Sequence, residues 1–72
     1  MNREAIREHL AQAERQSALG QACIDRQREI VTSLETHGYD PTRARRVLRR
    51  LEEQQLANLG ICRRLGGILV RI

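Results

Sequence analysis

Five arginines crowd into residues 43–50, and they are the strongest candidate for a functional cluster in this chain. They are Arg43, Arg45, Arg46, Arg49 and Arg50. Guanidinium groups bind phosphate and carboxylate oxygens through paired hydrogen bonds, so the cluster suits an anion. Like charges four residues apart destabilise an isolated helix by about 0.2–0.5 kcal/mol. We therefore expect an anionic group to lie opposite these side chains.

Two kinds of anion would fit the arginine cluster. One is a nucleic-acid backbone, because a helix face rich in arginine neutralises phosphates without reading sequence. The other is a carboxylate of the chain itself, from Asp25, Glu29, Glu35, Glu52 or Glu53. No aromatic side chain accompanies the arginines for base stacking. We expect ion pairing within or between chains, and sequence-nonspecific nucleic-acid binding is the alternative function.

The remaining reactive side chains give little support for metal binding or catalysis. His9 and His37 lie far apart, and neither they nor Cys23 belongs to a set of ligands with the spacing of a metal site. Gly66-Gly67 lacks the lysine of a phosphate-binding loop. A hairpin of two helices offers no pocket of its own for a nucleophile and a base. The sequence thus predicts no enzyme, no cofactor and no metal.

A long helix is the first element that would position these groups. Small and apolar residues recur from Ile6 to Leu34 in alternating steps of four and three, the heptad spacing of a helix packed along another helix. The positions are Ile6, Leu10, Ala13, Ser17, Gly20, Ile24, Gln27, Val31 and Leu34. A second helical face follows, made of Ala44, Val47, Leu48, Leu51, Gln55, Leu59 and Cys62. The chain is therefore expected to be all-α.

The turn between the two helices is well specified. Gly38 suits the left-handed conformation that ends a helix, Asp40 is a favoured N-cap, and Pro41 fits the first helical position. So short a connection makes the helices antiparallel, as in a coiled-coil-like hairpin. The expected single domain spans 1–72, with a helix over about 3–36, a turn at 37–40, a helix over about 41–65 and a tail at 66–72.

Details at the ends and between the helices follow from this hairpin. Asn2 can cap the first helix. Gly66-Gly67 is expected to end or bend the second helix, and the conformation of the tail is open. Facing residues have numbers that sum to about 77, which offsets Cys23 and Cys62 by about 12 Å along the axis. A disulfide within the chain is excluded at that separation.

The chain resembles a group of small uncharacterised helical-hairpin proteins from alphaproteobacteria. The likeness is carried by Arg3–Arg15, Arg26–Val31, Gly38–Asp40, Ala44–Leu48 and Leu51–Glu53, and it covers roughly residues 2–56. It implies a bacterial helical hairpin without an assigned activity. The ending Gly66-Gly67-Ile68-Leu69-Val70 departs from the polar helix in which those proteins end.

Composition makes an isolated hairpin marginal. The 72 residues include no Phe or Trp, and Tyr39 is the one aromatic residue. Chains of this size seldom build an adequate core alone, so we expect a homodimer that forms a four-helix bundle. The seam of that assembly would use Leu10, Gly20, Ile24, Gln27, Val31, Leu34, Leu48, Leu51 and Leu59, with Gly20 setting closeness and Gln27 setting register.

Charge and hydropathy bear on location. The net charge is +4, with five arginines against six acids in residues 1–36 and eight against three in residues 37–72. The longest apolar run, Ile68–Val70, is far below the ~18 residues that span a bilayer. A basic second helix with an apolar tail would suit a membrane surface, although Glu52 and Glu53 weaken that match. Free thiols and no leader sequence favour a cytoplasmic interaction protein.

Overall fold

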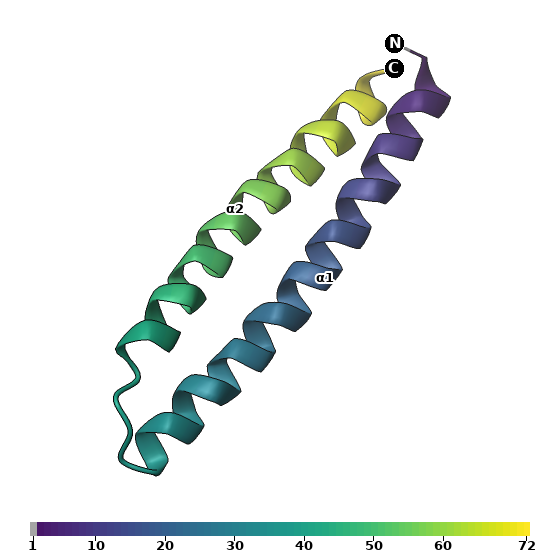
Figure 1. Cartoon of the computed structure of the whole chain (residues 1–72). Coiled ribbons are helices and arrows are strands. Elements are labelled where there is room, and N and C mark those ends of the chain that lie inside the picture. Colours follow the sequence, from purple (N-terminus) through teal and green to yellow (C-terminus); the bar gives the residue numbers. More distant parts are fainter. Residues whose placement is uncertain (1) are drawn as a thin grey trace.

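The computed structural model describes residues 2–72 as two long antiparallel helices joined by a short turn (Figure 1). Helix α1 runs over Arg3–Thr36 and helix α2 over Thr42–Arg71. Both ends of the chain lie at one end of the hairpin, and the turn lies at the other (Figure 1). The predicted all-α antiparallel hairpin is confirmed. The molecule is a rod of 54 × 14 × 13 Å.

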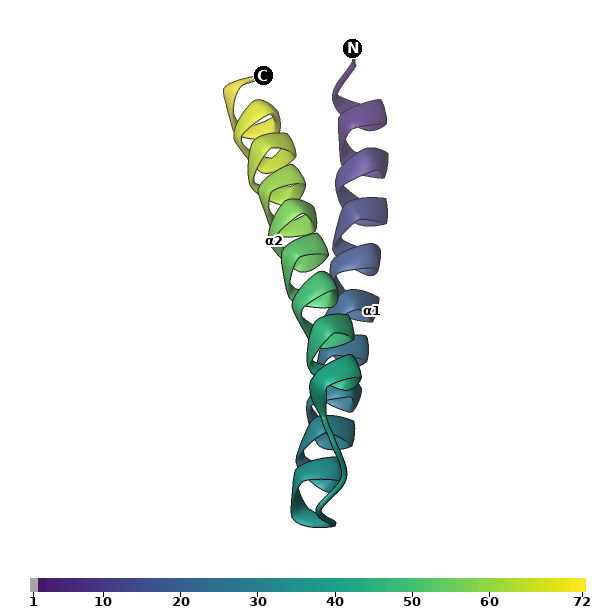
Figure 2. The ribbon, with the colours of Figure 1, turned by 60° about the vertical axis from the view of Figure 1, so that its left-hand side comes forward.

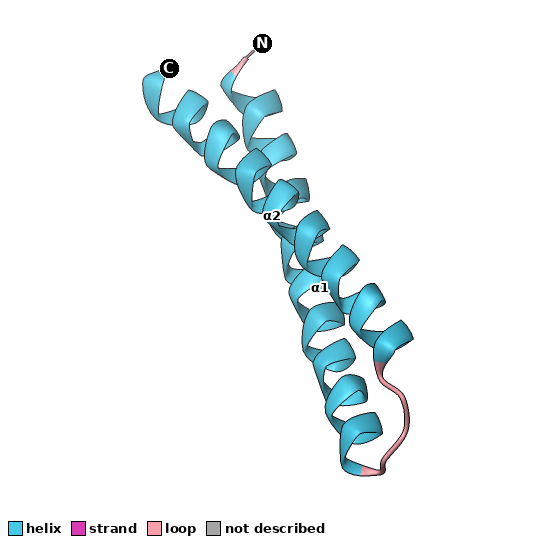
Figure 3. Cartoon of the chain, turned by 90° about the vertical axis from the view of Figure 1, so that its left-hand side faces the viewer, coloured by secondary structure: helices cyan, strands magenta, loops and turns pink. Residues whose placement is uncertain are grey.

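The axes of the two antiparallel helices cross at a shallow angle, as Figure 2 shows. A shallow crossing lets regularly spaced side chains of one helix pack between those of the other over many turns. Residues 37–41 connect the two helices and are drawn in pink in Figure 3. Nearly the whole described chain is thus helical, and the seam between the helices is its only core.

The buried and half-buried side chains of α1 follow the heptad pattern. All nine predicted positions from Ile6 to Leu34 are at least partly buried, and Ala5 is the one other residue of α1 that is not exposed. Ile6 is the most deeply buried of them, at 1% exposure. The alternating steps of four and three therefore mark the face of α1 that packs on α2.

The seam of α2 differs from the predicted face in two residues. Its positions are Ala44, Leu48, Leu51, Gln55, Asn58, Cys62, Leu65 and Leu69, again in steps of three and four. Leu59 and Val47 were expected on this face, but both are largely exposed. The step after Gln55 is three residues, which brings the polar Asn58 into the seam and turns Leu59 outward. The predictions that Val47 and Leu59 lie on the face that packs on α1 are therefore wrong, whereas the place of Leu59 in an assembly of two chains stays a prediction.

The second helix also continues beyond its predicted end. The expectation that Gly66-Gly67 ends or bends the helix is wrong, because α2 runs on to Arg71. Each glycine costs about 1 kcal/mol relative to alanine in a helix. The heptad places Leu65 and Leu69 on the seam beside the first turns of α1, where both are half-buried. Packing of these leucines outweighs the local cost, and the tail is helical.

The turn has the hydrogen bonds of a Schellman motif. Gly38 has a φ of 76°, the left-handed conformation that favours glycine. The N–H of Tyr39 donates to the carbonyl of Leu34 at 2.9 Å, and the N–H of Gly38 donates to that of Glu35 at 3.2 Å. At the start of α1, Asn2 Oδ1 accepts from the N–H of Ala5 at 2.7 Å. Both predicted caps of α1 are confirmed.

The start of α2 is capped from just outside the helix. It begins at Thr42, one residue later than predicted. Asp40 Oδ1 accepts hydrogen bonds from the N–H of Thr42 at 3.0 Å and from its hydroxyl at 2.6 Å. These bonds stabilise the carboxylate and hold the pKa of Asp40 below its ordinary value. Asp40 thus satisfies a free N–H of the first turn, but the N-cap is Pro41, so the predictions of Asp40 as the N-cap and Pro41 as the first helical residue are wrong by one position.

Acid is therefore expected to weaken this end of the hairpin. Because the folded pKa of Asp40 is lowered, its contribution is complete above the ordinary pKa of 3.8 and is lost as the pH falls through the lower folded pKa. Urea unfolding followed by circular dichroism between neutral pH and pH about 2 measures this loss. In Asp40→Asn, which cannot titrate, the drop in the urea midpoint should be smaller. An equal drop in both proteins would contradict this role.

Candidate interaction surface

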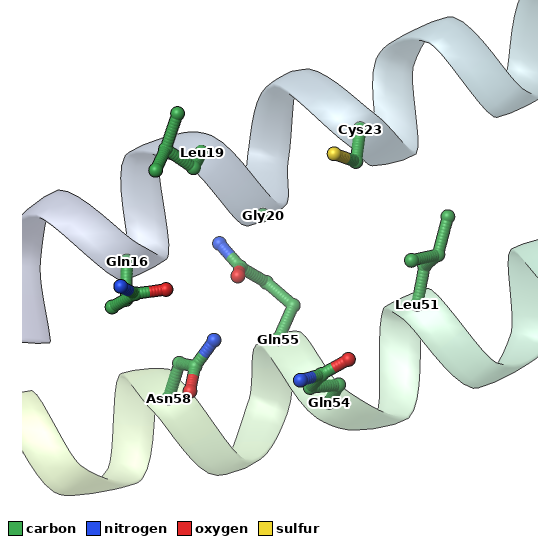
Figure 4. Close-up of a pocket in the computed structure, with 8 residues that line it drawn as sticks. All are labelled: Gln16, Leu19, Gly20, Cys23, Leu51, Gln54, Gln55 and Asn58. Carbon is green, nitrogen blue, oxygen red and sulfur yellow. The ribbon is translucent and has the colours of Figure 1, made fainter.

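A buried glutamine occupies the middle of the seam. Gln55 is 7% exposed and is the one fully buried polar residue in residues 2–72. Its Nε2 donates to the backbone carbonyl of Ser17 at 2.8 Å and lies 3.2 Å from the Ser17 hydroxyl. The side chain points from α2 toward α1 beneath Gly20 (Figure 4). Gln55 was expected on this face of α2, but the residues around it in the sequence do not predict that its side chain is buried.

Gly20 makes the room that Gln55 fills. A Cβ atom at residue 20 would collide with Gln55 Oε1, so only glycine fits without a shift. That oxygen has no hydrogen-bond donor among residues 2–72. The α-hydrogen of Gly20 that replaces a side chain points toward it, which gives at most a weak C–H···O contact. Gly20 does set the closeness of the helices at this layer, as predicted.

A second amide links the helices nearer the turn. Gln27 Nε2 donates to the backbone carbonyl of Ala44 at 3.0 Å, and Gln27 is half-buried. Together with Gln55 it ties each helix to a carbonyl of the other at a fixed position along the rod. Such bonds favour one register, because sliding the helices by a turn would leave buried amides unpaired. Gln27 therefore has a bond suited to its predicted role in register.

One flank of the seam is closed by ion pairs between the helices. Arg28 lies 3.3 Å from Glu52, and Arg45 lies 3.2 Å from Glu35. We call this side the ion-pair flank. It comprises every seventh residue, beginning at Arg7 on α1 and at Arg45 on α2. These residues are Arg7, Glu14, Gln21, Arg28, Glu35, Arg45, Glu52, Leu59 and Gly66. The pairs are exposed, and each contributes only about 0–1 kcal/mol.

The opposite flank has no carboxylate, arginine or lysine. It comprises every seventh residue, beginning at His9 on α1 and at Val47 on α2. These residues are His9, Gln16, Cys23, Ile30, Val47, Gln54, Ile61 and Ile68. We call it the apolar flank. Its four aliphatic side chains are all exposed. The two flanks of one seam therefore differ sharply in charge.

A shallow hollow opens at the middle of the apolar flank (Figure 4). Its volume is about 180 Å³, and it is lined by Gln16, Leu19, Gly20, Cys23, Leu51, Gln54, Gln55 and Asn58. The expectation that a hairpin has no pocket is wrong here, because a hollow opens between the two helices on this flank. Amides, leucines and one thiol line it, without a carboxylate or an imidazole. This lining suits packing and hydrogen bonding, and it provides no acid–base pair.

The cysteines stay apart, as the hairpin register predicts. Both thiols are free; Cys23 is exposed at the hollow, and Cys62 is half-buried on the seam of α2. The prediction that no disulfide joins them within the chain is confirmed.

The arginine cluster lies on the outer side of α2. All five of its side chains are exposed. Arg45 pairs with Glu35 of α1, as the internal ion-pairing expectation requires. Within residues 2–72, the other four members form no ion pair, and Glu52 pairs instead with Arg28. Glu35 is one of the five carboxylates considered as partners, and within residues 2–72 the cluster forms no ion pair with the other four, Asp25, Glu29, Glu52 and Glu53.

Neither helix of residues 2–72 has an apolar stretch long enough to cross a membrane, and no three His, Cys, Asp or Glu residues there gather closely enough to hold a metal ion. No protein-family model, no curated protein and no solved structure matches the chain. The resemblance to alphaproteobacterial hairpin proteins stays a prediction. Function is therefore argued from the surface of the hairpin itself.

Proposed function

We propose that this protein is a small non-enzymatic interaction module that self-associates, with two hairpins forming a four-helix bundle. The observation that carries the proposal is the small number of apolar residues that one chain buries. Only Ile6, Ile24, Val31 and Ala44 are buried apolar residues. Ten large hydrophobic side chains are exposed in residues 2–72, which is many for a chain of this length.

The exposed area supports the same proposal. The chain exposes 5767 Å², whereas a compact monomer of 8.3 kDa would expose about 4600 Å². Its radius of gyration is 16.4 Å, against about 11 Å for a compact domain of 72 residues. A single rod cannot bury both sides of its seam. A second rod beside it covers one side and adds apolar burial at about 25 cal/mol per Å².

The free thiols bear on the cellular location that we propose. Both cysteines are unpaired, which suits a reducing compartment such as the bacterial cytoplasm. We place the protein there.

Self-association is tested by sedimentation velocity at micromolar concentration. We expect a species with twice the chain mass of 8.3 kDa. The urea midpoint should rise with protein concentration, because association stabilises only the folded chain. A folded species with the mass of one chain and a midpoint independent of concentration would overturn the proposal.

The arginine cluster favours a second candidate, sequence-nonspecific nucleic-acid binding. Four exposed arginines without an ion pair within residues 2–72 are the observation behind it. Binding to random duplex DNA and RNA should then weaken steeply with salt. The double variant Arg46→Gln/Arg50→Gln should bind less, and Arg15→Gln, on α1 outside the cluster, should not. Equal affinity of all three proteins would rule the cluster out.

A further inference from the structure

We propose that the second copy packs on the apolar flank, with Leu19 of each chain seated at the hollow above Gly20 of the other. This inference rests on the self-association proposed above and names the face that it uses. The two copies would be related by a two-fold axis that passes through the hollow, perpendicular to the rod.

Charge selects this flank for a second copy. Each chain carries a net charge of +4, so two copies repel unless their contact avoids like charges. The apolar flank has no carboxylate, arginine or lysine at any of its positions. On the ion-pair flank, six of nine positions are charged, and burying them would cost several kcal/mol per ion that is not fully paired. Leu19 belongs to the outer row that borders this flank, and the same row includes the exposed Arg26, Arg50 and Arg64. Their long side chains can keep the guanidinium groups in water at the edge of the contact, so two apolar flanks can meet without burying a charge.

The position of the hollow fits a two-fold arrangement. Helix α1 runs over Arg3–Thr36, so Gly20 lies at its middle. A two-fold axis through the midpoint of a rod superposes the full lengths of both rods. It also brings the same patch of each chain together, as an isologous interface requires. The hollow at Gly20 is therefore placed where a copy of itself would face it.

Leu19 and the hollow provide complementary shapes. Leu19 is 63% exposed and stands at the rim of the hollow, next to Gly20 (Figure 4). A leucine this exposed gains free energy by packing against the apolar part of the lining, Leu19 and Leu51 of the other chain. Because Leu19 and the hollow belong to the same chain, the two-fold axis generates two equivalent contacts. Ile61 and Ile68 of α2 lie along the same flank and extend the apolar contact.

The length of the flank suits a contact between two rods. Each partner of a standard interface buries roughly 800 Å² of accessible surface, so a rod only 14 Å wide needs a contact along much of its 54 Å length. The apolar flank runs from His9 to Ile30 on α1 and from Val47 to Ile68 on α2.

The rival face is the ion-pair flank, which has a broader groove of about 460 Å³ lined by Glu14, Ser17, Ala18, Gln21, Gln55, Leu59 and Cys62. Leu56 and Leu59 are exposed on that side. Its lining includes the carboxylate of Glu14, and a second hollow that shares Gln21 and Gln55 with it is lined by the ion pair Arg28–Glu52. It serves as the comparison in the experiment.

The test places one glutamate on each face. Leu19→Glu and, separately, Ile61→Glu put a charge on the apolar flank, and Leu56→Glu puts one on the other side, where Leu56 is 71% exposed. All three sites are exposed helix positions, so helicity by circular dichroism should be retained. By sedimentation, we expect the apolar-flank variants to weaken dimerisation by about 30-fold or more. Leu56→Glu should change it by less than about threefold.

The outcomes separate this inference from the proposed function. A wild-type chain that stays monomeric overturns self-association itself. A wild-type dimer that Leu56→Glu dissociates and Leu19→Glu leaves intact overturns only the choice of face. Loss of the dimer in Leu19→Glu and Ile61→Glu alone supports both.

Discussion

Replacing Ile24 by alanine is expected to lower the free energy of unfolding by about 2–4 kcal/mol. Ile24 is 3% exposed and lies in the middle of α1, and only three other apolar residues are buried. A domain of this size has a total stability of about 4–10 kcal/mol. Losing one of four core side chains should therefore remove a large part of it. Urea unfolding followed by circular dichroism measures the change.

Leu56→Ala is the matched control for this truncation. Leu56 is a similar aliphatic residue on a helix but is mostly exposed. Its removal should change stability by less than about 0.5 kcal/mol. If both truncations cost the same, Ile24 is not part of the core that the seam defines.

The seam of α1 could be predicted because its signal does not depend on any single residue. Ser17, Gly20 and Gln27 are poor core residues, yet the alternating steps include them, and all three are half-buried. One helix face was enough to predict the hairpin, since the turn signals at Gly38 and Asp40 fixed where the chain reverses. Local chemistry therefore determined the fold class and the turn.

The errors at Leu59 and at the end of α2 share one cause, which is that the seam continues three residues after Gln55, at Asn58, and not four residues after it, at Leu59. Leu59 was chosen for its hydrophobicity, but the heptad continues through Asn58 and then Cys62. The same phase leads on to Leu65 and Leu69, which keep the chain helical beyond Gly66. Hydrophobicity and glycine content are local properties, whereas the packing partner along α1 decides which positions are buried.

The middle of the candidate site depended on the register between the helices. A sum of 77 for facing residues puts Gly20 opposite Ala57, but the side chains nearest to Gly20 are those of Gln55 and Asn58, on either side of Ala57. Two amides thus lie where the sum suggested one small side chain. Only the three-dimensional register therefore reveals the hollow and its polar floor.

Gly20→Ala is expected to lower the free energy of unfolding by up to about 2 kcal/mol, even though alanine favours a helix by about 1 kcal/mol. The new methyl group would collide with Gln55 Oε1. The end of the Gln55 side chain would have to move, and its hydrogen bonds to Ser17 would be lost. Two such bonds contribute about 1–3 kcal/mol together, against the gain of about 1 kcal/mol in helix propensity. Urea unfolding of the single variant measures the net effect.

The sign of this effect should reverse when Gln55 is removed. In a Gln55→Ala background the obstacle is absent, so Gly20→Ala should stabilise the chain by about 1 kcal/mol through helix propensity alone. Gly60→Ala gives the reference value, because a Cβ there meets no atom within 4 Å. The double-mutant cycle should then give a coupling of about 1–3 kcal/mol between Gly20 and Gln55. If Gly20→Ala stabilises the wild-type chain as much as Gly60→Ala does, the helices are not held close by this pair, and the hollow above Gly20 loses its structural basis.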